Sequence, residues 1–385
     1  FLQHFLPGQA LEENGHKSAG IQSAWYFFGN LDWVVGFDGE ATDAFLKETQ
    51  PSATEGSPFL VETIYQGTHY DYEVKAYTLA AFVQASMDVG DNVQIVTGVR
   101  AERVDYDYDN LMLAGRTRDD GTPCGFGGCR FNRPADRDDN FTNLSPKLGL
   151  IYNLDQHNQL YARIARGYRA PQATELYRLQ AGQNVSRIDS EQLDSLEAGI
   201  RGKRGALGYE FSVWTMKKDN FIFRDSNRTN VDNGETSHVG AEITLSYAFS
   251  DTLTGALYWS RARHEYDNNP DLASSDIEGN LIDTAPEEFG SANLRWRPSS
   301  KLLAELEWIH MGAYWEDPEN LHKYDGHDLL NLRVSYHVNR NLETFVRILN
   351  LPDERYAERA DFSFGEDRYF VGEPASLYLG FNLQI

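Results

Sequence analysis

The sequence contains no run of about 18 apolar residues, so a transmembrane helix is excluded. Basic residues are scarce: 35 Lys and Arg stand against 58 Asp and Glu, which gives a net charge of −23. Because nucleic-acid phosphates and anionic lipid headgroups attract Lys and Arg, this balance argues against a nucleic-acid partner and against a basic membrane-docking face. With 24% charged and 41% hydrophobic residues, the composition also excludes the collagen-like, disordered and disulfide-scaffold classes.

Motifs for catalysis and cofactor binding are missing as well. No Ser lies in a Gly-x-Ser-x-Gly elbow, no glycine-rich loop is suited to phosphate, and the ten His show no metal-ligand spacing. We therefore predict no catalytic residues, no metal site and no cofactor. The chain starts at Phe1, and residues 1–20 carry no basic region followed by an apolar stretch and a cleavage site, so we expect that processing or truncation removed what came first.

Aromatic residues are abundant, at 13%, and the chain alternates between apolar and polar residues in segment after segment. Residues 376–385 are the clearest case, because Leu377, Leu379 and Phe381 fall on one face while Tyr378 and Asn382 fall on the other. A period of two is the pattern of a β-strand with two unlike faces. It predicts fifteen strands, at residues 17–28, 33–40, 73–88, 93–108, 142–154, 159–169, 190–202, 206–224, 237–249, 253–266, 287–297, 302–315, 327–338, 342–350 and 376–385.

The polar face of these segments distinguishes a membrane barrel from a soluble sandwich. Sandwich strands usually have five or six residues, whereas a strand needs about 9 to 11 to cross a bilayer. Charged residues such as Arg163, Glu197 and Arg333 fall on the non-apolar face. An Arg or Lys exposed to lipid at the midplane costs roughly 2 to 4 kcal/mol, so these side chains should line a wet interior. The sequence therefore predicts an all-β fold, an antiparallel transmembrane β-barrel.

The links between the predicted strands alternate between short turns and stretches of roughly ten to thirty residues. Bacterial outer-membrane barrels have short periplasmic turns and long extracellular loops. We therefore expect the outer membrane of a Gram-negative bacterium, extracellular long loops and a periplasmic C-terminus. In this arrangement residues 1–16 are the tail of an extracellular loop, residues 17–385 form the barrel, and an odd number of strands precedes residue 1.

Cys124 and Cys129 are the two cysteines of the chain, and they lie in the glycine-rich segment Thr122–Cys129. With no His nearby and only two thiols, a zinc site is not expected. The even count and the spacing favour a small disulfide loop in an oxidising compartment, with two free thiols as the alternative.

Three segments resemble the barrel of the TonB-dependent outer-membrane receptors, which are plugged 22-stranded transporters. Residues 143–150 and 160–177 are similar to the family's hairpin "SP-x-LG … LY … G-[FY]-R-AP-x-x-x-EL[YF]". Residues 190–199 are similar to the family's "E-x-x-x-S-x-E-x-G", and residues 238–242, His-Val-Gly-Ala-Glu, go with them. Residues 350–356 are similar to "N-L-x-D-x-x-Y". The order and spacing of these segments over about 240 residues are more specific than any one of them.

The resemblance implies a receptor that imports a scarce ligand, most commonly a ferric siderophore, with energy delivered by TonB to a plug domain. The fifteen strands would be part of a 22-stranded barrel, the plug and the segment that recruits TonB lie outside these residues, and Ile385 stands where the family usually has an aromatic residue. The luminal wall, with Glu197, Arg201, Arg163 and Arg166 as a charge ladder, would face the plug; for each single residue ordinary cross-strand pairing is the favoured alternative. A plug-free porin is the alternative function. A barrel enzyme is a remote one, for which His69, His264 and His322 are the rim candidates.

An anionic chelate would be bound by aromatic faces and Arg side chains above the pore. The candidate ligand-binding residues are Tyr106, Tyr108, Arg116, Arg118, Tyr177 and Arg178. For the two tyrosines of residues 93–108, an interfacial aromatic girdle stays open as the alternative, because one bulge would turn them outward. Asp105, Asp107 and Asp109 should point outward, as a solvated acidic rim or as ligands for divalent cations that bridge to lipopolysaccharide.

Overall fold

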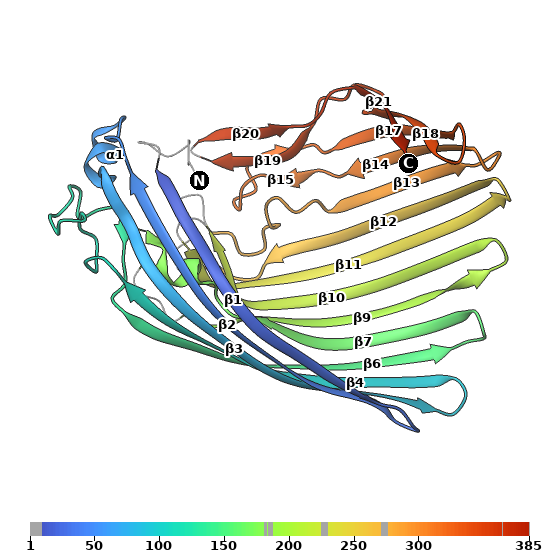
Figure 1. Ribbon diagram of the computed structural model, residues 1–385, viewed down its shortest axis with the longest axis horizontal. Helices are drawn as coiled ribbons and strands as arrows, with labels where there is room; N and C mark the ends of the chain where they lie inside the picture. Colours follow the sequence, from blue (N-terminus) through green and yellow to red (C-terminus); the bar gives the residue numbers. More distant parts are fainter. Residues whose placement is uncertain are drawn as a thin grey trace.

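The computed structural model describes residues 10–180, 183, 188–224, 230–270, 276–363 and 365–384. Its main element is one antiparallel sheet of fifteen strands, in which the neighbours follow chain order (Figure 1). The strands are β1 (Leu11–Phe27), β2 (Asp32–Gln50), β3 (Gly67–Val89), β4 (Val93–Asn110), β6 (Arg137–Asn153), β7 (Asn158–Arg169), β9 (Glu191–Arg204), β10 (Leu207–Arg224), β11 (Asn230–Ser250), β12 (Leu253–Tyr266), β13 (Glu288–Trp296), β14 (Leu302–Met311), β17 (His327–His337), β18 (Leu342–Leu349) and β21 (Ser376–Leu383). All fifteen predicted strands are confirmed, and β1 and β21 form the two edges of the sheet.

Short turns join the strands at one end of the sheet and long loops at the other (Figure 1). The long loops carry the remaining elements: α1 (Pro58–Thr63), β5 (Phe131–Asn132), α2 (Ala173–Tyr177), β8 (Leu179–Gln180), β15 (Tyr314–Trp315), β16 (Lys323–Tyr324), β19 (Ala357–Ser363) and β20 (Glu366–Val371). In the part of the chain that the structure describes, no helix is long and apolar enough to cross a membrane.

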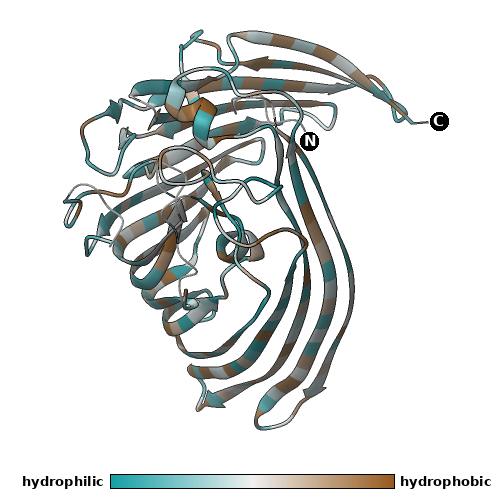
Figure 2. Ribbon diagram, turned by 90° about the vertical axis from the view of Figure 1, so that its left-hand side faces the viewer, coloured by the Kyte–Doolittle hydropathy of each residue, from teal (hydrophilic) through white to brown (hydrophobic). Residues whose placement is uncertain are grey.

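Hydropathy alternates along the strands, as the bands of Figure 2 show. On the outer, convex face large apolar side chains are exposed, among them Ile21, Trp25, Leu79, Leu148 and Leu379. An exposed apolar surface that extends over a whole sheet is what contact with lipid requires. The inner, concave face carries the polar and charged side chains. The long loops fold against this face at the long-loop end of the strands, which we call the upper end (Figure 2).

The first strand begins earlier than the sequence predicts. β1 starts at Leu11, and its first residues pair with the end of β2, from Leu11 opposite Thr49 to His16 opposite Ala44. Residues 11–16 are therefore strand and not loop. The four strands β1 to β4 have 17, 19, 23 and 18 residues, which is well beyond the 9 to 11 needed to cross a bilayer, so they continue past the apolar belt at the long-loop end.

One member of the predicted luminal charge ladder is misplaced. Arg163 pairs with Glu197 across β7 and β9 on the inner face, whereas Arg166 lies on the outer face and bonds Asp194 at 2.5 and 2.7 Å. Residues three apart in a strand necessarily point to opposite faces, so Arg163 and Arg166 cannot share one wall. The ladder prediction was wrong for Arg166.

Candidate functional site

The long loops and the upper ends of the strands pack into one buried group on the inner face, which we call the aromatic roof. Its buried members are Leu46, Ile64, Tyr65, Tyr70, Tyr72, Val74, Tyr108, Cys124, Cys129, Phe131, Leu176, Tyr177, Ile188 and Ile222, with Leu60, Tyr106, Phe141 and Ala173 partly buried against them. Strands β2, β3, β4 and β10 and three loops contribute to it. The roof thus joins segments that are far apart in the sequence at the long-loop end.

Three of the predicted ligand residues are among the tyrosines of this roof. Tyr108 and Tyr177 are stacked, with ring centroids 4.1 Å apart, and both are almost fully buried. The Tyr177 hydroxyl donates to Asp139 at 2.9 Å, while the Tyr108 hydroxyl has no hydrogen-bond partner among the described residues. Tyr106 is only partly buried, and its hydroxyl donates to the Pro171 carbonyl at 3.2 Å. The phenols of Tyr106 and Tyr108 lie on the inner face, so the structure does not place them in an outer aromatic girdle.

The disulfide between Cys124 and Cys129 is present, with the two Cα atoms 4.8 Å apart. Arg116 lies across this small loop, and its Nε donates to the carbonyl of Cys129 at 2.9 Å. Arg118 is half-buried nearby, and its Nε has no partner among the described residues. Arg116 therefore lies against the Cys-closed tip, and the Arg118 Nε keeps hydrogen-bonding capacity.

Arg178 differs from these two arginines because it is already neutralised. It forms ion pairs with Glu48 and, at 2.9 Å, with Glu12. Glu48 also contacts His69, whose Nδ1 lies 3.0 Å from its carboxylate and whose Nε2 lies 2.8 Å from the carbonyl of Tyr65. Both ring nitrogens of His69 face oxygen acceptors, so neither is free for catalysis. Burial alone would raise the pKa of Glu48, but the hydrogen bond from His69 and the charge of Arg178 hold that pKa below its usual range.

Arg133 is a buried residue that sequence reasoning missed. Its guanidinium donates to the carbonyls of Leu113 at 2.8 Å, Thr117 at 2.7 Å and His69 at 3.2 Å. One side chain thereby ties the loop between β4 and β5 to β3. An Arg flanked by Asn132 and Pro134 looks like an ordinary loop residue in the sequence, and no spacing signal marks it.

The inner wall below the roof is polar. Arg100 bonds Asp38 at 2.5 Å and Glu102 at 2.9 Å, and the Tyr161 hydroxyl lies 3.2 Å from both Glu197 and Glu210. A cavity of about 390 Å³ lies along this wall between β4 and β10. Cross-strand ion pairs and hydrogen bonds of this kind suit a water-filled lumen.

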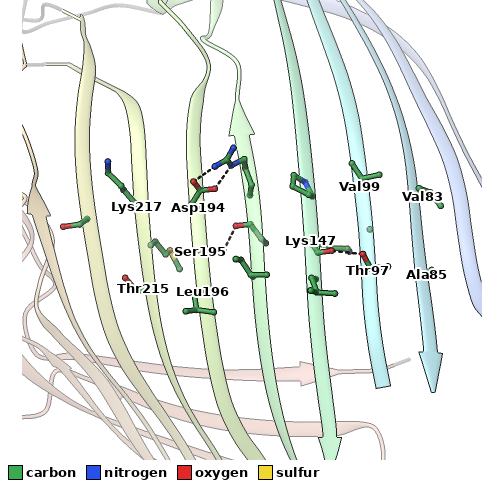
Figure 3. Close-up of a pocket in the computed structure, with 18 residues that line it drawn as sticks. Val83, Ala85, Thr97, Val99, Lys147, Asp194, Ser195, Leu196, Thr215 and Lys217 are labelled. Atoms are coloured by element: carbon green, nitrogen blue, oxygen red, sulfur yellow. Dashed lines mark hydrogen bonds and ion pairs between the residues drawn. The ribbon is translucent and has the colours of Figure 1, made fainter. Parts of the chain in front are cut away.

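A larger groove, of about 990 Å³, lies on the opposite face (Figure 3). Val83, Val99 and Leu196 line it, and the Arg166–Asp194 pair lies at its edge. These side chains belong to the outer, apolar face, so the groove opens on that face and not on the polar inner wall.

A second loop region holds an unusual carboxylate. Glu316, between β15 and β16, is buried, and neither of its carboxylate oxygens has a hydrogen-bond partner among the described residues. Burial, and then the nearby charge of Asp367, raise the pKa of Glu316 above its ordinary value.

Asp105 and Asp107 point outward as predicted, Asp105 paired with Arg103 at 2.7 Å. Within the described residues no three His, Cys, Asp or Glu side chains are grouped to hold a metal ion.

The TonB dependent receptor-like β-barrel model matches residues 5–351 of the chain. The chain belongs to the TonB-dependent receptor family. The curated vitamin B12 transporter BtuB of Photobacterium profundum is 26% identical over 255 residues, which are 62% of this chain and 39% of that protein. The ferric yersiniabactin uptake receptor FyuA of Yersinia pestis superimposes with a TM-score of 0.74 at 16% identity, covering 97% of this chain and 55% of FyuA. The siderophore receptor PiuA of Acinetobacter baumannii gives a TM-score of 0.76 at 14% identity, covering 97% of this chain and 56% of PiuA.

TonB-dependent receptors are outer-membrane β-barrels, and the resemblance inferred from the sequence is confirmed. The chain spans little more than half the length of the solved receptors and about two-fifths of the curated one. All three relatives are named as transporters or receptors, and none as an enzyme.

Proposed function

We propose that this chain forms part of the barrel of an outer-membrane receptor that binds a ferric siderophore and imports it with energy delivered through TonB. The aromatic roof is the observation that carries the proposal. A passive porin needs an open lumen, whereas a receptor must hold its ligand before admitting it. Buried aromatic packing and neutralised charges above a polar wall suit the second task.

In this proposal the long-loop end is extracellular, and β21 ends in the periplasm. The plug domain and the segment that recruits TonB belong to the full-length receptor, and the plug would face the polar inner wall. The apolar outer face would contact outer-membrane lipid and lipopolysaccharide.

The six predicted ligand residues have three roles in this proposal. Tyr106, Arg116 and Arg118 are only partly buried and would contact the chelate directly. Tyr108 and Tyr177 are buried and would support that surface from below. Arg178 is neutralised by Glu12 and Glu48, so it would hold the roof closed and would not bind an anion in this conformation.

The test is equilibrium binding of ⁵⁵Fe-labelled catecholate, hydroxamate and phenolate siderophores, with cobalamin as a fourth probe, to the purified full-length receptor. Tyr106→Ala combined with Arg118→Ala should weaken binding of the preferred ferric complex at least tenfold, because a desolvated Arg–anion contact contributes on the order of 2 to 5 kcal/mol. Arg103→Ala is the matched control, since Arg103 lies exposed on the outer face.

Unchanged affinity in the double variant would remove these residues from the site. Binding of cobalamin and of none of the ferric complexes would overturn the siderophore class. A steady open conductance of the full-length protein in planar bilayers would favour the porin.

A further inference from the structure

Three adjacent strands place a potential metal ligand at the same level of the inner face. Met216 of β10 pairs with His238 of β11, and His238 pairs with His264 of β12. Directly paired residues of antiparallel strands point to the same face with Cβ atoms about 4.5 to 5.5 Å apart. The register therefore forms a row of one thioether and two imidazoles, which we call the Met–His–His row.

The two imidazoles already converge. Nδ1 of His238 lies 2.8 Å from Nδ1 of His264, and the ring centroids are 5.0 Å apart. Two protonated Nδ1 atoms cannot face each other at this distance, so at least one of them presents a lone pair. The other ring nitrogen of His238 lies 3.0 Å from the Thr236 hydroxyl, which fixes the ring and leaves Nδ1 directed at His264.

An aromatic wall borders the row on its lower side. Trp214 and its partner Gly240 form the next inner-face pair of the ladder towards the short turns, and a Cβ atom at Gly240 would come within 2.4 Å of the indole. The indole also lies beside His264, with centroids 6.2 Å apart. The glycine therefore lets the indole cover the backbone next to the two imidazoles.

The ordinary reading of such a row is cross-strand packing, which contributes about 0.2 to 1 kcal/mol per pair. A hydrogen bond between the two imidazoles accounts for the meeting of the Nδ1 atoms, but neither that bond nor packing requires a thioether at the position that pairs with His238. The thioether is a soft ligand and the two imidazoles suit copper, so the row favours Cu(I) over the hard cations Mg²⁺ and Ca²⁺, and competition with Zn²⁺ is part of the test. In a three-coordinate site with metal–imidazole bonds of about 2.0 Å, the two ligand nitrogens lie less than about 1 Å farther apart than the 2.8 Å that separates the Nδ1 atoms of His238 and His264. Small rotations of the two rings provide this separation.

We infer that Met216, His238 and His264 form a Cu(I)-binding site on the luminal wall. The site is independent of the ligand that the roof admits, so the siderophore proposal can fail while this one stands. It lies on the inner face, at a level where the outward neighbours Lys217 and Arg263 are charged, and so just beyond the apolar belt of the barrel.

The experiment is an anaerobic Cu(I) competition titration of the full-length receptor against bicinchoninate. Wild-type protein should bind one Cu(I) ion. The affinity for this ion should fall at least a hundredfold in the double variant His238→Ala with His264→Ala, and at least tenfold in Met216→Leu. Met87→Leu with His337→Ala is the matched control, because Met87 is exposed on the outer face and His337 lies at the short-turn end. His264→Asn, which keeps a polar side chain of similar length, guards against a variant that fails to fold.

X-ray absorption gives a second readout that a packing role would not move. Wild-type protein loaded with Cu(I) should show a copper–sulfur scattering path that Met216→Leu removes. Three results would each overturn the site: no stoichiometric Cu(I) binding beyond that of the double His variant, tighter binding of Zn²⁺ than of Cu(I), or a copper–sulfur path that persists in Met216→Leu.

Discussion

Removing Arg178 should open the aromatic roof without unfolding the barrel. The Arg178 side chain is 17% exposed and faces Glu48, which is 1% exposed, so Arg178→Ala leaves a buried carboxylate whose remaining partner is the hydrogen bond with His69. Breaking a buried ion pair from one side costs roughly 3 to 5 kcal/mol, because the other charge stays buried and uncompensated. That energy is lost where the pair lies, between the upper ends of β1 and β2 and the loop after α2.

Hydrogen exchange of the full-length receptor in detergent measures this loss directly. Backbone amides of the roof, around residues 65–72 and 172–180, should exchange about a hundredfold or more faster in Arg178→Ala, while amides of β9 and β10 near the short turns should not change. Arg103→Ala removes an exposed pair with Asp105, which solvent screens, so hydrogen exchange of the roof in this variant should stay close to that of wild type. Arg178→Met with Glu48→Gln removes both charges and should restore most of the protection. Roof exchange that stays within a factor of three of wild type in Arg178→Ala would refute the reasoning.

Three further predictions concern the loops. Cys124→Ser with Cys129→Ser should cost about 2 kcal/mol, confined to the tip of its loop, as measured by local hydrogen exchange. Tyr108→Phe should leave the stability of the roof unchanged or slightly higher, because the buried hydroxyl has no partner among the described residues. Tyr177→Phe should lower the stability of the roof by about 1 kcal/mol, because the hydrogen bond to Asp139 is lost. Proteolysis assays measure both changes, and equal losses of stability in the two variants would contradict this prediction. The pKa of Glu316 is raised, so the folded loop favours the protonated acid, and its stability should fall as pH rises above the ordinary value near 4.5. Glu316→Gln should remove that pH dependence and slow proteolysis of the loop at pH 7; faster cleavage would contradict it.

The fold was predictable because apolar and polar residues alternate with a period of two in every strand. The outer positions must be apolar wherever lipid touches them, so all fifteen strands could be found from the sequence. Their upper ends could not, because above the apolar belt the outer face becomes charged, as at Lys17 and Asp43, and the alternation that marks a strand disappears. This is why β1 starts six residues before its predicted position.

The candidate site was predictable only in part. Tyr106 and Tyr108 are separated from Arg100 by an even number of residues on the same strand, so their inward direction follows from the inward direction of that charged side chain. The disulfide follows from the count and spacing of the cysteines. The partners of Arg178 do not follow from any local pattern, because Glu48 is 130 residues away and Glu12 farther still. Arg133 and the Met–His–His row likewise depend on segments that only the folded chain brings together.

The most direct test of the central claim is uptake of ⁵⁵Fe-siderophore by cells that lack their other siderophore receptors and carry the full-length form of this one. For a TonB-coupled siderophore receptor, uptake should be saturable and should stop when TonB is deleted or the proton gradient is collapsed, while binding to the cell surface persists. Uptake that continues at the same rate without TonB, or that rises linearly with concentration and never saturates, would contradict it and identify a passive channel.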